Sequence, residues 1–231
     1  MNGEFVQITA SEGHSFNGYY CQGQADKPAL VLLHEIFGIT DWVKSITEDF
    51  AAKGYWVCAP DMYGRVDPGF IGNREEPEVY ERSRNYRDTM DRQAAMLDIE
   101  ATADFLKGQP GCNGKYAVTG FCMGGTLTYL AAARLQPDAA IAYYGTQVHD
   151  FLDEGRHVDC QTILHMGEHD HLVGPENDHR IHAALIGKFN IAIYKYDAGH
   201  AFANSTQPDR YNAEAAELAH QRTFALLDKL Q

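Results

Sequence analysis

The segment Gly120-Phe121-Cys122-Met123-Gly124-Gly125 constrains the fold of this chain more than any other. It follows the apolar run 116–119 and precedes a Thr-, Leu- and Ala-rich stretch typical of a helix. So tight a turn from strand to helix needs small flanking residues, and it raises the central side chain above the carboxyl edge of a sheet. The helix then directs its N–H groups at the Cys122 sulfur, which favours a thiolate. The pattern indicates Gly-x-nucleophile-x-Gly; the alternative is a buried cysteine in an ordinary loop.

Two later segments could supply a base and an acid that orients it. Asp170 follows the predicted strand 161–166, and His200 follows the predicted strand 191–196. Ligand-facing residues of an open parallel sheet lie at the carboxyl ends of its strands, so we expect Cys122, Asp170 and His200 to meet. Their order along the chain, nucleophile then acid then histidine, is the order of this kind of triad.

Each of these residues also has an alternative interpretation. Asp170 could cap a helix or form a turn, and Glu168 is a second candidate acid. His200 could be a hydrogen-bonded loop histidine. The three assignments support one another because the turn, the acid and the histidine all follow predicted strands.

Six short segments together match a known pattern. They are 33–38 (LHEIFG), 59–63 (APDMY), 120–125 (GFCMGG), 143–145 (YYG), 165–170 (HMGEHD) and 198–202 (AGHAF). From about residue 30 to 204 the chain resembles the dienelactone hydrolase family, the carboxymethylenebutenolidase-like α/β-hydrolases. The resemblance implies that Cys122 is the nucleophile, Asp170 the acid and His200 the base. It also implies that Glu35 contacts the resting thiol and helps to ionise it when substrate binds.

Further residues are expected around this triad. The backbone N–H groups of Ile36, in the first strand-to-helix loop, and of Met123, after the nucleophile, would hold the oxyanion. Three aromatic residues next to the predicted loops would form pocket walls: Phe37, Tyr144 and Phe202.

The family resemblance is weakest at the substrate carboxylate. Family members that hydrolyse dienelactones bind it with two arginines. One lies four residues after the catalytic histidine, where this chain has Asn204. The other lies in a helix-rich insertion, where this chain has Tyr80, with Arg82 and Arg84 nearby. The resemblance therefore supports the catalytic residues more strongly than it supports a dienelactone as the substrate.

The choice of cysteine narrows the substrate class. A free cysteine thiol has a pKa of about 8.5, whereas alkoxides are the bases of acids nearer water, at about 15.7. From a shared tetrahedral intermediate the thiolate leaves before an alkoxide. The sequence thus predicts hydrolysis of small activated esters or enol-lactones, by acyl transfer through a thioester.

Alternating strand and helix patterns predict an α/β-hydrolase fold with a mainly parallel sheet and helices on both faces. We expect an N-terminal antiparallel hairpin, one domain over 1–231 and no separate cap domain. The expected strands are 4–9, 16–22, 29–34, 55–59, 116–119, 139–143, 161–166 and 191–196, and the expected helical regions are 41–53, 77–107, the segment after Cys122, 175–187 and 209–230.

Composition restricts the partners. The formal net charge is −13, which disfavours nucleic acid and anionic membranes. No leader and no spanning segment is evident, and an odd number of cysteines, five, indicates free thiols. We therefore expect a cytoplasmic monomer or small homo-oligomer. No zinc spacing accompanies the histidines of 165–182 and no GxGxxG loop is present, so we expect neither metal nor cofactor.

Two other functions fit part of the sequence. One is a non-catalytic ligand receptor on a hydrolase fold, although a receptor has no need of a base and an orienting acid. The other is a redox-sensing protein that uses Cys122, although no resolving cysteine is obvious.

Overall fold

The computed structural model describes residues 3–231, so Met1 and Asn2 lie outside the described residues. The chain divides into two compact units, residues 1–116 with Gln231, and residues 117–230. The interpretation of 1–231 as a single domain stays a prediction.

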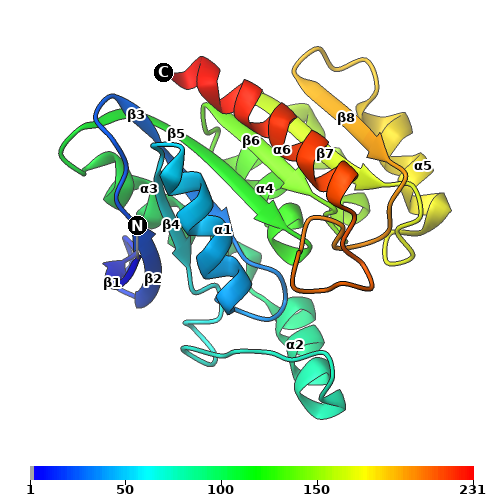
Figure 1. Ribbon diagram of the computed structural model, residues 1–231, viewed down its shortest axis with the longest axis horizontal. Helices are drawn as coiled ribbons and strands as arrows, with labels where there is room; N and C mark the ends of the chain where they lie inside the picture. Colours follow the sequence, from blue (N-terminus) through cyan, green and yellow to red (C-terminus); the bar gives the residue numbers. More distant parts are fainter. Residues whose placement is uncertain (1–2) are drawn as a thin grey trace. The chain divides into compact units, whose positions relative to one another are not determined.

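The first unit contains four strands in the order β1-β2-β4-β3 (Figure 1). They are β1 (Glu4–Thr9), β2 (Ser15–Cys21), β3 (Lys27–Leu33) and β4 (Trp56–Pro60). β1 and β2 are antiparallel, with Phe5 opposite Tyr19, which confirms the predicted hairpin. β2 and β4 are also antiparallel, whereas β3 and β4 are parallel. Every residue of β4 is buried, as expected for a strand covered on both faces.

Three helices belong to the first unit: α1 (Asp41–Ala52), α2 (Pro77–Thr89) and α3 (Arg92–Lys107). The helical region expected over 77–107 is therefore interrupted. The Asp91 side chain accepts hydrogen bonds from the N–H groups of Gln93 and Ala94, so it caps a new helix. A capping aspartate offers the backbone an alternative to helical hydrogen bonds, and the continuous interpretation overlooked it.

The second unit contains the remaining strands, in the order β5-β6-β7-β8. β5 (Cys112–Phe121) begins in the first unit, and β6 (Ala139–Tyr143), β7 (Gln161–Gly167) and β8 (Ile191–Tyr196) follow. All neighbouring pairs in this unit are parallel, which confirms the mainly parallel sheet.

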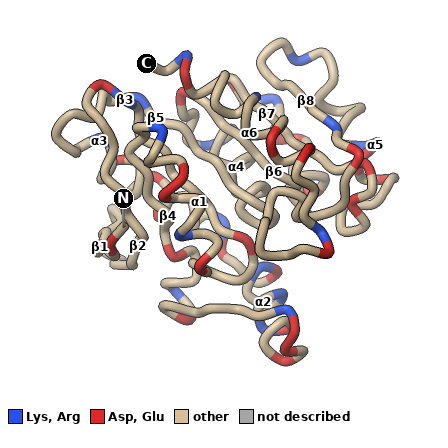
Figure 2. Tube along the Cα trace, viewed as in Figure 1, with Lys and Arg blue, Asp and Glu red and all other residues tan. Residues whose placement is uncertain are grey.

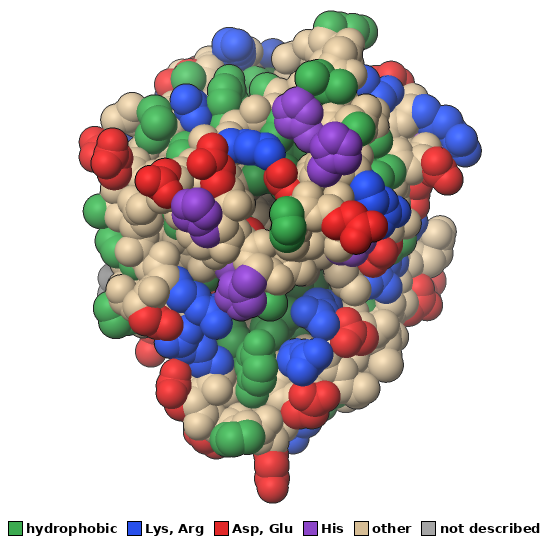
Figure 3. Space-filling view, turned by 90° about the vertical axis from the view of Figure 1, so that its right-hand side faces the viewer, with side chains coloured by type: hydrophobic (Ala, Val, Ile, Leu, Met, Phe, Trp, Pro, Cys, Tyr) green, Lys and Arg blue, Asp and Glu red, His purple; other side chains and the backbone are tan. Residues whose placement is uncertain are grey.

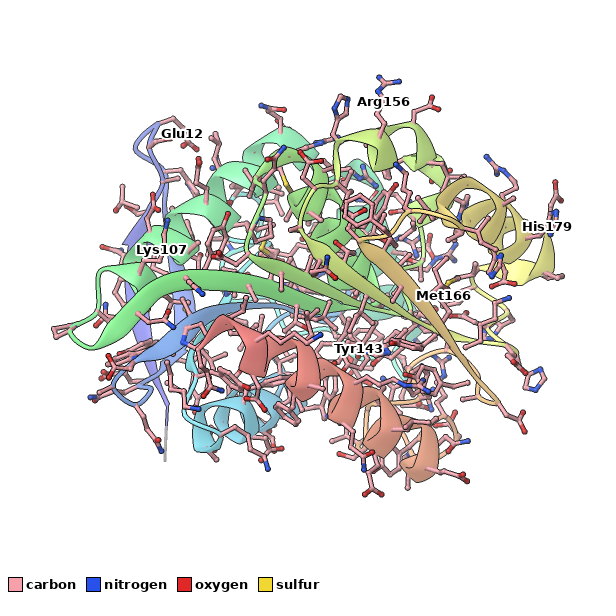
Figure 4. All side chains as sticks on the ribbon, turned by 90° about the horizontal axis from the view of Figure 1, so that it is seen from above. Glu12, Lys107, Tyr143, Arg156, Met166 and His179 are labelled. Carbon is pink, nitrogen blue, oxygen red and sulfur yellow. The ribbon has the colours of Figure 1, made fainter. Side chains whose placement is uncertain are left out.

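Helices cover both faces of these strands. The elements are α4 (Met123–Arg134), α5 (Gly174–Leu185), α6 (Ala213–Leu227) and the short 3-10 segments η1 (Val148–Asp150), η2 (Leu152–His157) and η3 (Asp228–Leu230). Figure 4 shows α6 on one side of β6, β7 and β8, with α4 and α5 on the other. α6 begins at Ala213 rather than near Asp209 because the Asn212 side chain caps it.

Charged residues of both signs are distributed along each unit (Figure 2). On α2, for example, both arginines and acidic residues are present, and Arg84 pairs with Glu81 at 3.3 Å. Across residues 3–231, the length and apolar character needed for a membrane-spanning helix occur in none of the helices.

Candidate active site

Cys122 occupies a strained turn between β5 and α4. Its φ is 56° and its ψ −113°, a conformation uncommon for a residue other than glycine. Its N–H donates a hydrogen bond to the Tyr143 carbonyl at 3.0 Å, and its side chain is buried. Met123 is the first residue of α4, so the helix N-terminus starts directly after the sulfur-bearing residue. This is the geometry that the Gly-x-Cys-x-Gly pattern predicts.

The flanking glycines leave no room for a side chain. A Cβ at position 120 would lie 2.3 Å from the Gly124 carbonyl oxygen, and one at position 125 would lie 2.4 Å from the Tyr143 carbonyl oxygen. Both neighbours are backbone atoms, which cannot rotate away. The same Tyr143 carbonyl thus holds the Cys122 N–H and fixes how closely α4 approaches β6.

Substitution of Gly125 by alanine is therefore expected to destabilise the fold by about 3 kcal/mol, at the upper end of the usual overpacking cost. Gly108→Ala is the matched control, since position 108 has an ordinary φ of −74° and the nearest atom to a Cβ there is 3.3 Å away. Urea unfolding followed by circular dichroism measures both. Equal transition midpoints for the two variants would show that the turn relaxes freely.

His200 and Asp170 form a buried pair in the second unit. His200 Nδ1 lies 2.8 Å from Asp170 Oδ2. Asp170 Oδ1 accepts a hydrogen bond from the N–H of Leu172 at 2.9 Å and a longer one from Val173. Asp170 therefore forms a turn through one oxygen and contacts His200 through the other, and its role as the acid stays a prediction. Glu168, the second candidate acid, is exposed.

The charges of this group are coupled. Burial alone raises the pKa of Asp170, but the hydrogen bond and charge of His200 and the two backbone N–H groups lower it overall. Burial alone lowers the pKa of His200, but the charge of Cys122 and the hydrogen bonds of His200 to Asp170 and Cys122 raise it to about 10. The contacts of His200 with Asp170 and Cys122 thus favour the protonated imidazole.

One of the expected aromatic residues, Tyr144, packs against His200, and a second, Phe202, packs against Tyr144. The Tyr144 ring packs edge-on against the imidazole with centroids 5.1 Å apart, and against the Phe202 ring at 5.2 Å. Asn204 is buried further along the same loop, where its Oδ1 accepts hydrogen bonds from the N–H and the hydroxyl of Thr206. Asn204 Oδ1 therefore stabilises the turn between Asn204 and Thr206.

Glu35, Ile36 and Phe37 follow β3 in the first unit. Both Glu35 and Ile36 are buried, and the Ile36 carbonyl accepts a hydrogen bond from the Tyr63 hydroxyl at 3.0 Å. His34 links this loop to Met62, since its Nδ1 donates to the Glu35 carbonyl and its Nε2 accepts from the Met62 N–H. Burial lowers the pKa of His34, which agrees with a neutral ring in these two roles.

The two candidate arginines differ in their surroundings within the first unit. The Phe37 and Tyr80 rings lie 6.1 Å apart, and Arg84 is one helical turn beyond Tyr80 on α2. The Arg82 guanidinium instead packs 4.8 Å over the Phe70 ring. Arg84 is thus the arginine on the same helix face as Tyr80.

Sequence reasoning missed a buried polar network behind the strand ends of the second unit. The Thr223 hydroxyl on α6 lies 2.6 Å from the Tyr143 hydroxyl and 3.1 Å from His165 Nε2. His165 Nδ1 in turn lies 2.7 Å from the Tyr196 hydroxyl, and burial lowers the pKa of His165 well below its ordinary value. The available signal was a histidine inside an otherwise apolar strand.

The histidines of 165–182 lie in different surroundings. His169 pairs with Asp197 at 2.8 Å on the surface, and His165 belongs to the buried network. Figure 3, which faces the side of the molecule carrying α5, shows several histidine side chains. Among residues 3–231, no group of three or more His, Cys, Asp or Glu side chains could hold a metal ion.

Comparison with known proteins identifies the family of this chain. The model of the dienelactone hydrolase family matches residues 16–231. The chain belongs to the dienelactone hydrolase family. It is 30% identical to a carboxymethylenebutenolidase of Pseudomonas putida, covering 99% of this chain and 97% of that protein. It is 29% identical to carboxymethylenebutenolidase 1 of Cupriavidus pinatubonensis, covering 100% and 99%.

Solved structures show the same fold at lower identity. A dienelactone hydrolase-like promiscuous phosphotriesterase, P91, from metagenomic libraries is 20% identical with a TM-score of 0.80, over 100% of this chain and 99% of that one. The Pyrococcus furiosus esterase Pf2001 is 17% identical with a TM-score of 0.70, over 94% and 90%. The α/β-hydrolase fold is thereby confirmed. As a dienelactone hydrolase family member, the chain is a hydrolase of ester or lactone bonds, with a small molecule as substrate.

Proposed function

We propose that this family member hydrolyses small activated esters or enol-lactones with a Cys122–His200–Asp170 triad, through a thioester acyl-enzyme. The observation that carries the proposal is the position of His200, which is hydrogen-bonded to both Asp170 and Cys122 at the strained turn. A receptor or a redox sensor would not need such an arrangement, and the family assignment favours the hydrolase.

In the proposed reaction the Cys122 thiolate attacks the ester carbonyl, and a C–S bond forms. The oxyanion is held by the N–H of Met123 and, as the sequence predicts, by that of Ile36. Protonated His200 then gives its proton to the leaving oxygen as the C–O bond breaks. Neutral His200 takes a proton from water, whose oxygen attacks the thioester, and the acid product and the thiolate are released.

Asp170 holds His200 in one tautomer. Because Nδ1 is hydrogen-bonded to Asp170, Nε2 is the ring nitrogen that exchanges the proton with substrate. We propose that Glu35 assists ionisation of the thiol. We further propose that the substrate contacts the side chains predicted from the sequence, namely Phe37, Arg82, Arg84, Tyr144, Phe202 and Asn204. The acidic composition and free cysteines favour a cytoplasmic monomer or small homo-oligomer without nucleic-acid or membrane partners.

The leaving group decides the substrate. An enolate or phenolate competes with the thiolate as a leaving group, whereas an ethoxide does not. We expect p-nitrophenyl acetate to be hydrolysed at least about 100-fold faster than ethyl acetate, a difference of about 2.7 kcal/mol in activation free energy. A carboxylate-bearing enol-lactone serves as the third substrate. Similar kcat/KM values for the aryl and the ethyl ester would refute the thiolate mechanism.

A further inference from the structure

A pocket of about 180 Å³ lies in the second unit, at the start of β7 and beside β8 and α6. Its polar lining includes Arg222, Lys229, Gln161 and the Tyr194 ring, and its apolar lining includes Ala192 and Leu226. Gln161 is the first residue of β7, whereas Asp170 follows the carboxyl end of that strand. The pocket is therefore at the opposite end of the strand from the triad.

The two cations of this pocket have no acidic partner. Among residues 3–231, no carboxylate oxygen lies within 4.0 Å of the charged nitrogens of Arg222 or Lys229. Some basic side chains of the same unit do have a carboxylate partner, as Arg134 has in Glu154 and Lys195 in Asp178. In a chain of net charge −13, two unpaired cations lining one pocket form a local attraction for an anion.

Arg222 is also held in a fixed orientation. Its guanidinium lies 4.1 Å over the Tyr194 ring and 5.3 Å from the Tyr196 ring centroid. One of its N–H groups donates to the Tyr196 hydroxyl at 3.0 Å, and that hydroxyl is itself hydrogen-bonded to the buried His165. A guanidinium has five N–H donors in a rigid fork, so a preorganised Arg222 retains donors for a second, planar partner.

We propose that this pocket binds a small organic carboxylate, at a site separate from the triad and independent of the proposed mechanism. The carboxylate pairs with the Arg222 fork, a charge-assisted contact that is stronger than a neutral hydrogen bond. The Lys229 ammonium adds a second positive charge. Ala192 and Leu226 cover a short hydrocarbon body, which inorganic phosphate lacks. Benzoate should therefore bind more tightly than phosphate, and neutral benzamide should bind least.

The test is a titration of the full ¹⁵N-labelled chain, followed by NMR, after Cys122 has been blocked with iodoacetamide. Benzoate, phosphate and benzamide are the three probes. We expect saturable benzoate shifts at the amides of Ala192 and Leu226, with a Kd at least tenfold weaker in Arg222→Gln and in Lys229→Gln. Arg222→Lys keeps the charge and should retain part of the affinity.

Arg156→Gln is the matched control. Arg156 is an exposed arginine on η2, and Figure 4 shows it on the other side of the strands from α6. This variant should bind benzoate like the wild type. Lys229→Gln keeps the test valid if Arg222→Gln unfolds, since Lys229 is exposed on η3. No saturable benzoate binding, or binding unaffected by both substitutions, would overturn the proposal.

Discussion

Cys122→Ala is expected to lower kcat for p-nitrophenyl acetate by about 10⁴- to 10⁶-fold, the range typical of removing a catalytic nucleophile. Without the sulfur no thioester can form, and the remaining groups only polarise the carbonyl. Steady-state hydrolysis and the burst of p-nitrophenol measure the loss. The burst should vanish with the turnover, because it reports acylation of this residue.

The matched control for this variant is Cys160→Ala. Cys160 is half-buried in the same unit, and its sulfur lies 3.5 Å from the Thr162 hydroxyl, at the start of β7. Burial raises the pKa of that thiol, so it should contribute neither burst nor turnover. If turnover survives Cys122→Ala but is lost in Cys160→Ala, Cys160 at the start of β7 is the nucleophile, and the proposed triad is refuted.

Asp170→Asn is expected to lower kcat by about 10⁴-fold with little change in fold. An amide at this position can present its N–H₂ to His200 and favour the wrong tautomer, so that Nε2 can no longer exchange a proton as required. Kinetics with p-nitrophenyl acetate at pH 7 measure the effect. Glu168→Gln is the control, since this neighbouring acid is exposed and should leave kcat within about twofold. Equal losses in the two variants would contradict the assignment of Asp170.

Asp170→Asn is also expected to shift the pH dependence of activity, in a direction that follows from the pKa of His200. In the proposed reaction His200 acts as an acid in the first step, and its pKa is raised to about 10 by the Cys122 charge and by Asp170. Wild-type activity should therefore fall as the pH rises through about 10. Loss of the Asp170 carboxylate lowers the pKa of His200, so the alkaline decline moves toward neutral pH in the variant. An unchanged alkaline limb would show that another group controls it.

The free energy of unfolding should also depend on pH through the charges of Asp170 and His200. The pKa of Asp170 is lowered in the folded state, so its contribution to the free energy of unfolding is complete above its ordinary value. That contribution is lost as the pH falls through the lowered value. The stability difference between the wild type and Asp170→Asn in urea should thus shrink on acidification. His200 behaves oppositely, since its contribution is lost as the pH rises from its ordinary value through about 10.

Local sequence patterns predicted the strand ends and the turn at Cys122. Parallel strands bring their carboxyl ends together, so the residues after β7 and β8 could be placed next to Cys122 without knowing any distance. The break before α3 was missed, although Asp91 is a local capping signal. The contacts of Thr223 with Tyr143 and His165 join residues 80 and 58 positions apart, and no local pattern specifies them. The pairing state of Arg222 likewise depends on tertiary packing.

The Tyr143 carbonyl holds the Cys122 N–H, while the hydroxyl of the same residue is held by Thr223 of the last helix. The turn at Cys122 is formed by the six consecutive residues 120–125. The residue that holds the Tyr143 hydroxyl, Thr223, lies about a hundred positions later in the chain. During translation, residues 120–125 would therefore leave the ribosome long before Thr223 is synthesised. Until α6 docks, the nascent chain carries the thiol without the hydroxyl partner that fixes Tyr143, and its reactivity should mature only at the end of synthesis.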